Sequence, residues 1–150
     1  MKKIILILLF ASSMMYAKDY KVVFDLMTSS ECKLNKALIK NVEKLRTYYK
    51  KNGDTLKVAV VISGGSYKFF VKDLNNSPYN HDKDLKHTFY KRSSMLTKFS
   101  KNVNIEVCSM GMAKRGIKPE VLQDFVVPAF NKTDALIRYQ NDGYAYIPIK

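Results

Sequence analysis

Two cysteines are the residues of this chain best suited to covalent chemistry. Cys108 ends the apolar run 103–107, and a Ser-Met-Gly stretch and two cations, Lys114 and Arg115, follow it. A thiol becomes a nucleophile when its anionic form is stabilised, and nearby cations and free backbone amides have that effect. The alternative is an inert buried residue, because free cysteine is among the residue types most often buried. The pattern alone leaves both interpretations open.

Cys32 comes directly after a group of hydroxyl residues that favour a helix start, and it could pair with Cys108, stay free or form a redox couple with it. If one strand lies between the two strands that lead to the cysteines, those strands are about 10 Å apart. A disulfide joins Cα atoms roughly 4.4–6.8 Å apart. A disulfide in the resting protein therefore requires both loops to fold inward.

Three further residues accompany the cysteines. Gly64 and Gly65 form a turn after an almost wholly apolar run, and Asp25 is an acid within the apolar run 21–27. Asp25 is either a proton acceptor facing the functional rim or a residue at the exposed end of its strand.

Several established sites are absent from the sequence. There is no P-loop, no G-x-S-x-G elbow and no C-x-x-C pair. His81 and His87 lie in a polar stretch with two aspartates, without the ligand spacing of known metal sites, and a solvated loop is the simpler interpretation. We therefore expect neither a metal nor a cofactor.

Strand-like and helix-like segments alternate along the chain. Strands are predicted over 21–27, 56–63, 103–107, 126–130 and 144–149, and helices over 31–49, 66–74, 88–99, 118–125 and 134–142, with an exposed loop over 75–87. This alternation predicts a parallel sheet covered by helices on both faces. Pro128 favours an edge position for its strand, because proline cannot donate to a ladder, and Thr133 is the expected cap of the last helix.

The candidate residues are predicted to meet at one edge of this sheet. Ligands of open parallel sheets bind beyond the carboxyl ends of the strands. Cys108, the segment with Cys32 and the Gly64-Gly65 turn each follow the carboxyl end of a predicted strand.

Residues 1–17 have the pattern of a secretory signal peptide: two lysines, a short apolar core and small residues up to Ala17. The core is shorter than the roughly 20 residues of a membrane span. We expect cleavage after Ala17, with a cut after Ser13 as the alternative. A hydrophobic first strand of the domain is the competing interpretation. The expected mature protein is a single domain over 18–150, periplasmic or secreted and not membrane-spanning, with 75–87 as a loop insertion.

The chain is strongly basic, with 26 Lys and Arg against 13 Asp and Glu and a formal net charge of +13. Such a surface attracts anionic partners. Nucleic acid is not expected, because the chain carries a secretory pattern and no recognition motif. Anionic lipid, acidic proteins and small oxyanions remain candidates, as does a solvated surface without a specific ligand.

Three segments together resemble the DsrE/DsrF-like family: IEVCSMGMAKRGI from residue 105, VVPAF from residue 126 and ALIRYQNDGYAYI from residue 135. The resemblance runs from the first predicted strand to the end of the chain. It implies a three-layer α/β/α fold of flavodoxin-related architecture, with a five-stranded parallel sheet in which the second strand lies between the first and the third. It also implies a homo-oligomer, often a trimer or hexamer.

The resemblance implies a function in sulfur relay. Cys108 matches the relay cysteine that carries sulfur as a persulfide, with Lys114 and Arg115 stabilising the anion and Gly64-Gly65 shaping the pocket. Cys32 would resolve the persulfide or lock it as a disulfide, and another protein would donate or accept sulfur. The protein would then be a sulfurtransferase or a sulfur carrier. The rival hypothesis is a non-catalytic homo-oligomeric binding module whose basic surface holds an anion or an acidic protein.

Overall fold

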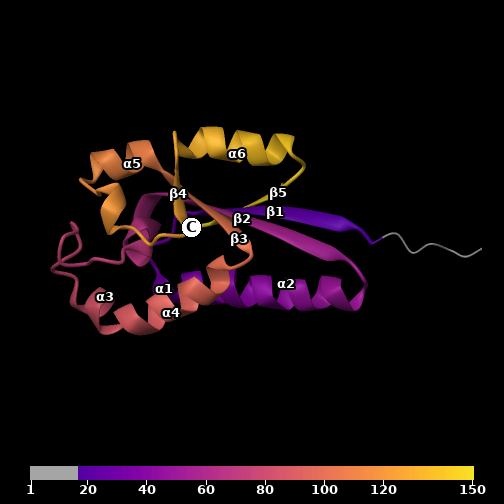
Figure 1. Ribbon diagram of the computed structural model, residues 1–150, viewed down its shortest axis with the longest axis horizontal. Coiled ribbons are helices and arrows are strands. Elements are labelled where there is room, and N and C mark those ends of the chain that lie inside the picture. The colour runs from indigo at the N-terminus through magenta and orange to yellow at the C-terminus, as the bar shows by residue number, and fades with distance from the viewer. Residues whose placement is uncertain (1–16) are drawn as a thin grey trace, which may run out of the picture.

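A computed structural model describes residues 17–150, so the predicted signal peptide, Ala17 apart, lies outside the described residues. The predicted architecture is confirmed: five parallel strands form one sheet between two layers of helices (Figure 1). The strands are β1 (Asp19–Leu26), β2 (Thr55–Ile62), β3 (Val103–Cys108), β4 (Val126–Ala129) and β5 (Ala145–Ile149). Their order is β4-β3-β2-β1-β5, which places β2 between β1 and β3 and puts the strand with Pro128 at an edge, as expected.

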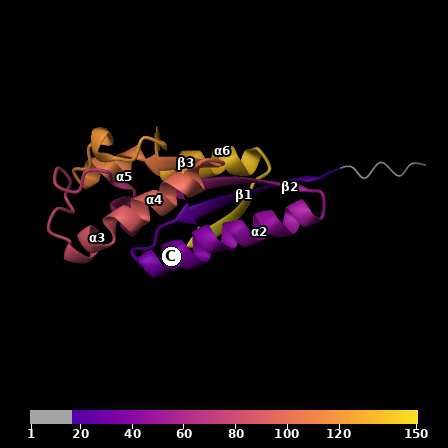
Figure 2. The same ribbon diagram turned by 60° about the horizontal axis from the view of Figure 1, so that its bottom comes forward.

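The helices cover the two faces of the sheet unequally. One helical segment begins with α1 (Glu31–Lys33), passes through a π-helical stretch (Leu34–Ile39) and ends with α2 (Lys40–Lys51). Together with α3 (Lys83–His87) and α4 (Phe89–Ser100), it lies on one side of the sheet, and α6 (Lys132–Asn141) lies on the other (Figures 1 and 2). The short α5 (Ser109–Lys114) follows the carboxyl end of β3.

The two faces of the sheet differ in composition because successive strand residues point to opposite sides. The face under α2 and α4 is apolar and includes Phe24, Val60 and Ile105. The face under α6 carries a much smaller apolar cluster, and two acids of the sheet, Asp25 and Glu106, bond to residues of α6. The ion pairs therefore anchor α6 where apolar contact is limited.

The helix predicted over 118–125 is wrong. Only one 3₁₀ turn forms there, Pro119–Val121. The amide of Lys72 donates to the carbonyl oxygen of Val121 at 2.8 Å, and the amide of Gln123 donates to that of Phe70 at 2.9 Å. These bonds to the distant segment 70–72 hold the chain extended, which a helix would not permit.

The segment 75–87 is not wholly an exposed loop. It ends in α3, whose first turn is capped by Asp82, and the side chains of Ser77 and Leu85 are buried. The buried Arg92 donates to the carbonyl oxygen of Leu85 at 3.0 Å, so the segment is attached to α4. None of the helices within residues 17–150 combines the length and the hydropathy needed to cross a bilayer.

Candidate functional site

Cys108 lies at the junction of β3 and α5. The Ser-Met-Gly stretch after it is helical, and Cys108 is the N-cap of this helix: the Gly111 amide donates to the sulfur at 3.4 Å. A backbone amide at the start of a helix lacks an intrahelical acceptor, so the sulfur satisfies a donor that the helix leaves free. Cys108 is only 9% exposed, yet it lines an open pocket. It is therefore a mostly buried residue at the wall of a pocket rather than a surface thiol.

Tyr67 fixes the backbone around Cys108. Its hydroxyl donates to the carbonyl oxygen of Cys108 at 3.1 Å, and the guanidinium of Arg115 lies 5.1 Å from the centre of its ring. Burial is the main cause that raises the pKa of Tyr67, followed by its interaction with the Cys108 side chain. Gly111 is required at this point, because a Cβ there would lie 2.0 Å from the Tyr67 hydroxyl oxygen.

The pocket beside Cys108 has a volume of about 400 Å³, and all its charged lining residues are basic. Lys114, Arg115 and Lys132 line it, and no carboxylate does. Within residues 17–150, neither Lys114 nor Arg115 forms an ion pair with an acid. Two of these cations were predicted from the sequence, and the pocket that holds them is open to an anion.

Asp25 does not lie at an exposed strand end; that alternative is wrong. It is 1% exposed, because β1 is flanked by β2 and β5 and covered by α6. Its Oδ2 accepts from Lys132 Nζ at 3.2 Å and from the Tyr146 hydroxyl at 3.0 Å, while its buried Oδ1 has no partner among the described residues. Burial, and secondly the bond to Asp25, raise the pKa of Tyr146.

Lys132 is the pocket residue that sequence reasoning missed. It is the first residue of α6 and follows the end of β4, so its position at the rim could have been inferred from the order of elements. Asn131, rather than Thr133, caps this helix: the Asp134 amide donates to the Asn131 side-chain oxygen at 2.8 Å. The cap fixes the turn that carries Lys132.

The structure does not bring the two cysteines together in one pocket. Both are free thiols, and the exposed Cys32 lines a different pocket, beside Thr88 and Arg92. Of the two glycines expected to shape the pocket, only one lines it. Gly64, with φ of +60°, lines the Cys108 pocket, whereas Gly65 packs against Ser29, where a Cβ would approach the Ser29 Cβ to 2.7 Å.

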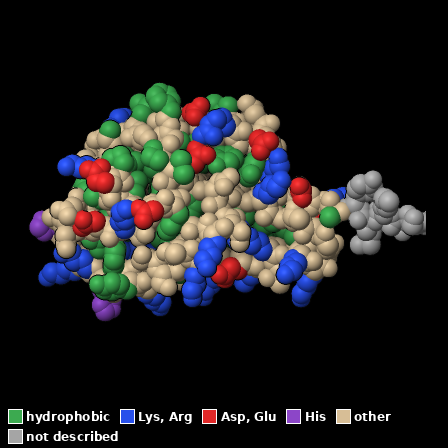
Figure 3. All heavy atoms as spheres, in the orientation of Figure 1, with side chains coloured by type: hydrophobic (Ala, Val, Ile, Leu, Met, Phe, Trp, Pro, Cys, Tyr) green, Lys and Arg blue, Asp and Glu red, His purple; other side chains and the backbone are tan. Residues whose placement is uncertain are grey.

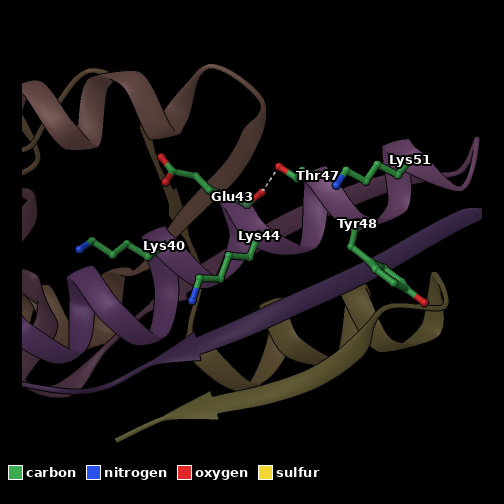
Figure 4. Close-up of a pocket in the computed structure, with 6 residues that line it drawn as sticks. All are labelled: Lys40, Glu43, Lys44, Thr47, Tyr48 and Lys51. Carbon is green, nitrogen blue, oxygen red and sulfur yellow. Dashed lines mark hydrogen bonds between the residues drawn. The ribbon is translucent and has the colours of Figure 1, made fainter.

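Another hollow lies on the outer surface of α2, with a volume of about 530 Å³. Figure 4 shows that Lys40, Lys44 and Tyr48 point outward in different directions, and that the bond drawn there joins the Thr47 hydroxyl to the carbonyl oxygen of Glu43. No group of side chains converges on one point. The hollow is a solvated helix surface, and Figure 3 shows blue side chains predominating along this side of the molecule.

The two histidines of segment 75–87 lie at the surface. Across residues 17–150, no three His, Cys, Asp or Glu side chains are grouped closely enough to hold a metal ion.

Comparisons with known proteins agree with this fold. A protein of unknown function from Methanobacterium thermoautotrophicum, MTH1491, has a similar structure, with a TM-score of 0.64 and 22% sequence identity over 87% of this chain and 99% of that one. No match was found among curated proteins. Residues 21–149 match the sequence pattern of the DsrE/DsrF-like family. This chain is a member of the DsrE/DsrF-like family.

Proposed function

We propose that this protein carries sulfane sulfur as a persulfide on Cys108. Its family is associated with sulfur relay in general. The observation that carries the proposal is the position of Cys108: it receives an amide hydrogen bond and lines a pocket with three cations and no carboxylate. Positive charge around sulfur favours its anionic forms, which are the nucleophilic ones.

The proposed transfer is a thiol–persulfide exchange. The Cys108 thiolate attacks the outer sulfur of a donor persulfide, R–S–SH, forming a new S–S bond as the bond between the two donor sulfurs breaks. The products are the Cys108 persulfide and the donor thiolate, so no external oxidant or reductant is consumed. An acceptor thiolate then attacks the outer sulfur on Cys108 and restores the original thiolate. Tyr67 and Gly111 hold the Cys108 backbone in place, and Lys114 and Arg115 lie in the pocket where the charge moves.

Mass spectrometry of the intact protein after incubation with a persulfide donor tests the proposal. We expect Cys108 to gain one sulfur atom, which a reductant removes, and Cys108→Ser to abolish the gain. Cys32→Ser is the matched control, because Cys32 lines a different pocket, and it should retain the gain. The role of Cys32 as a resolving thiol stays a prediction. A Cys108 that reacts with alkylating reagents but never gains sulfur rules out the relay function.

We also propose that the protein is exported and assembles with copies of itself. Assembly is supported by exposed apolar side chains at β4, α6 and β5, namely Val127, Phe130, Ile137, Tyr146 and Ile147. Light scattering coupled to gel filtration should give a mass above that of one chain, reduced by Phe130→Asp. N-terminal sequencing of protein recovered from the periplasm or medium should begin at Lys18.

A second candidate function, binding of an acidic protein, is favoured by the surface of α1 and α2. Between residues 33 and 51 the sequence has seven basic residues and one acid, Glu43, and all six lysines among them are exposed. An acidic partner bound there would be released by salt and by Lys40→Glu combined with Lys44→Glu. Such binding would be unaffected by Cys108→Ser, which separates it from sulfur transfer.

A further inference from the structure

We infer that the Cys108 pocket selects a small anionic donor. Lys132, which is held by the buried Asp25 and by Met27, is the residue whose ammonium binds this anion. The identity of the ligand as a sulfur donor rests on the function proposed above. The selection of an anion is a separate property, and its test does not depend on sulfur transfer.

The charge of the pocket supports the selection of an anion. Three cations and Cys108 line one pocket of about 400 Å³. Such a volume suits a small molecule rather than a folded partner. A cationic donor would meet three like charges near the thiol, while an anion would be attracted. The donor class is therefore a small anion whose reactive sulfur reaches Cys108.

Lys132 is placed to act on such a ligand. Its side chain is 32% exposed, and its ammonium contacts Asp25 Oδ2 and the sulfur of Met27, each at 3.2 Å. An ammonium has three N–H donors. Two are directed at these partners, and the third has no acceptor among residues 17–150, so it is free for an anion in the pocket.

Asp25 limits the charge that Lys132 presents. Its carboxylate is 1% exposed and held from the other side by Tyr146, so it stays behind the lysine and does not itself line the pocket. In the free protein Asp25 offsets the charge of Lys132. Neutralising Asp25 should therefore strengthen anion selection, whereas neutralising Lys132 should weaken it.

The test compares alkylation of Cys108 by iodoacetate, an anion, with alkylation by neutral iodoacetamide. Cys32, exposed and in another pocket, is the internal reference. Trypsin places the two thiols on separate peptides, 22–33 and 102–114, so mass spectrometry measures both in one sample. We expect the iodoacetate-to-iodoacetamide rate ratio to be higher at Cys108 than at Cys32. Sodium sulfate, compared with sodium chloride at equal ionic strength, should slow the alkylation of Cys108 by iodoacetate and leave the alkylation of Cys32 unchanged.

Two substitutions give opposite predictions. One unit charge about 6 Å away in water changes the rate ratio about threefold. We expect Asp25→Asn to raise the ratio at Cys108 by about this factor and Lys132→Gln to lower it by a similar factor. If Lys132→Gln fails to fold because Asp25 loses its partner, the doubly neutral Asp25→Asn/Lys132→Gln protein replaces it, and its ratio at Cys108 should fall about threefold below that of Asp25→Asn alone.

The outcomes separate the two proposals. Equal ratios at Cys108 and Cys32, shifts of both variants in the same direction, or a Cys108 that neither reagent reaches would overturn the anion pocket. An anion-selective Cys108 that gains no sulfur from any persulfide donor would leave the pocket in place and overturn only the sulfur-carrier function.

Discussion

Gly111→Ala is the substitution whose effect follows most directly from the structure. The new Cβ would lie 2.0 Å from the Tyr67 hydroxyl oxygen, 3.0 Å from the ring carbon that bears it and 3.5 Å from the Cys108 sulfur. Tyr67 is 1% exposed and cannot move into solvent. The hydroxyl must therefore shift, and its 3.1 Å bond to the Cys108 carbonyl oxygen breaks.

The expected cost follows from three contributions. Overpacking costs about 1–3 kcal/mol, and the buried Tyr67 hydroxyl left without its acceptor costs about 1–3 kcal/mol. Alanine is better than glycine in a helix by about 1 kcal/mol, which offsets part of this. We expect Gly111→Ala to lower the free energy of unfolding by about 3 kcal/mol net, within a range of about 1–5 kcal/mol.

Urea unfolding of four proteins measures this: the wild type, Gly111→Ala, Tyr67→Phe and the double variant. Tyr67→Phe removes the hydroxyl oxygen that the new Cβ would approach most closely. In this background Gly111→Ala should therefore lower the free energy of unfolding by less than about 1 kcal/mol, which is a coupling energy of about 2 kcal/mol between the two positions. Cys108 should also be alkylated faster in Gly111→Ala, with Cys32 unchanged. A cost that is the same in both backgrounds, or no cost at all, would refute the proposed role of Gly111.

Three further predictions concern the scaffold. Arg92→Leu should lower the free energy of unfolding by about 1–3 kcal/mol in urea titrations, because the Leu85 carbonyl oxygen loses the buried guanidinium that donates to it; the exposed Lys91→Ala should change it by less than about 0.5 kcal/mol. Asn131→Ala should cost about 1 kcal/mol as the loss of a helix cap, and Thr133→Ala, on the same turn, should cost clearly less. Burial, followed by a hydrogen bond to a β3 carboxylate, raises the pKa of Tyr139 above its ordinary 10.0. The protonated Tyr139 hydroxyl therefore contributes fully to the free energy of unfolding below that pH, and this contribution is lost as the pH rises further. Between about pH 9 and pH 11 the wild type should lose more stability than Tyr139→Phe does. Equal losses would contradict this.

The fold was predictable because its signals are local. Apolar runs bounded by glycines and polar turns place each strand within about two residues of its observed limits, and Pro128 identifies an edge strand without reference to any other element. The position of Cys108 at the carboxyl rim follows from this alternation alone. The two neighbouring cations, Lys114 and Arg115, follow from their closeness in sequence.

The remainder of the site depends on partners distant in the chain. Gly111 suggests a turn when considered alone, but its function is to leave room for Tyr67, which belongs to another element. Asp25 meets Lys132 and Tyr146, 107 and 121 residues later, and its burial follows from those contacts rather than from its own strand. The extended backbone at 121–123 likewise depends on pairing with residues 70–72. A local pattern contains no information about such partners.

The pairing of β1 with β5 has a consequence during synthesis. The first strand lies inside the sheet, and its outer neighbour is β5, whose Tyr146 follows Asp25 by 121 residues. Until that strand emerges from the ribosome, β1 has an unpaired edge and the Asp25 carboxylate lacks Tyr146. Open strand edges promote aggregation, so the nascent chain should depend on chaperones until β5 is made, and clones lacking β5 should form inclusion bodies.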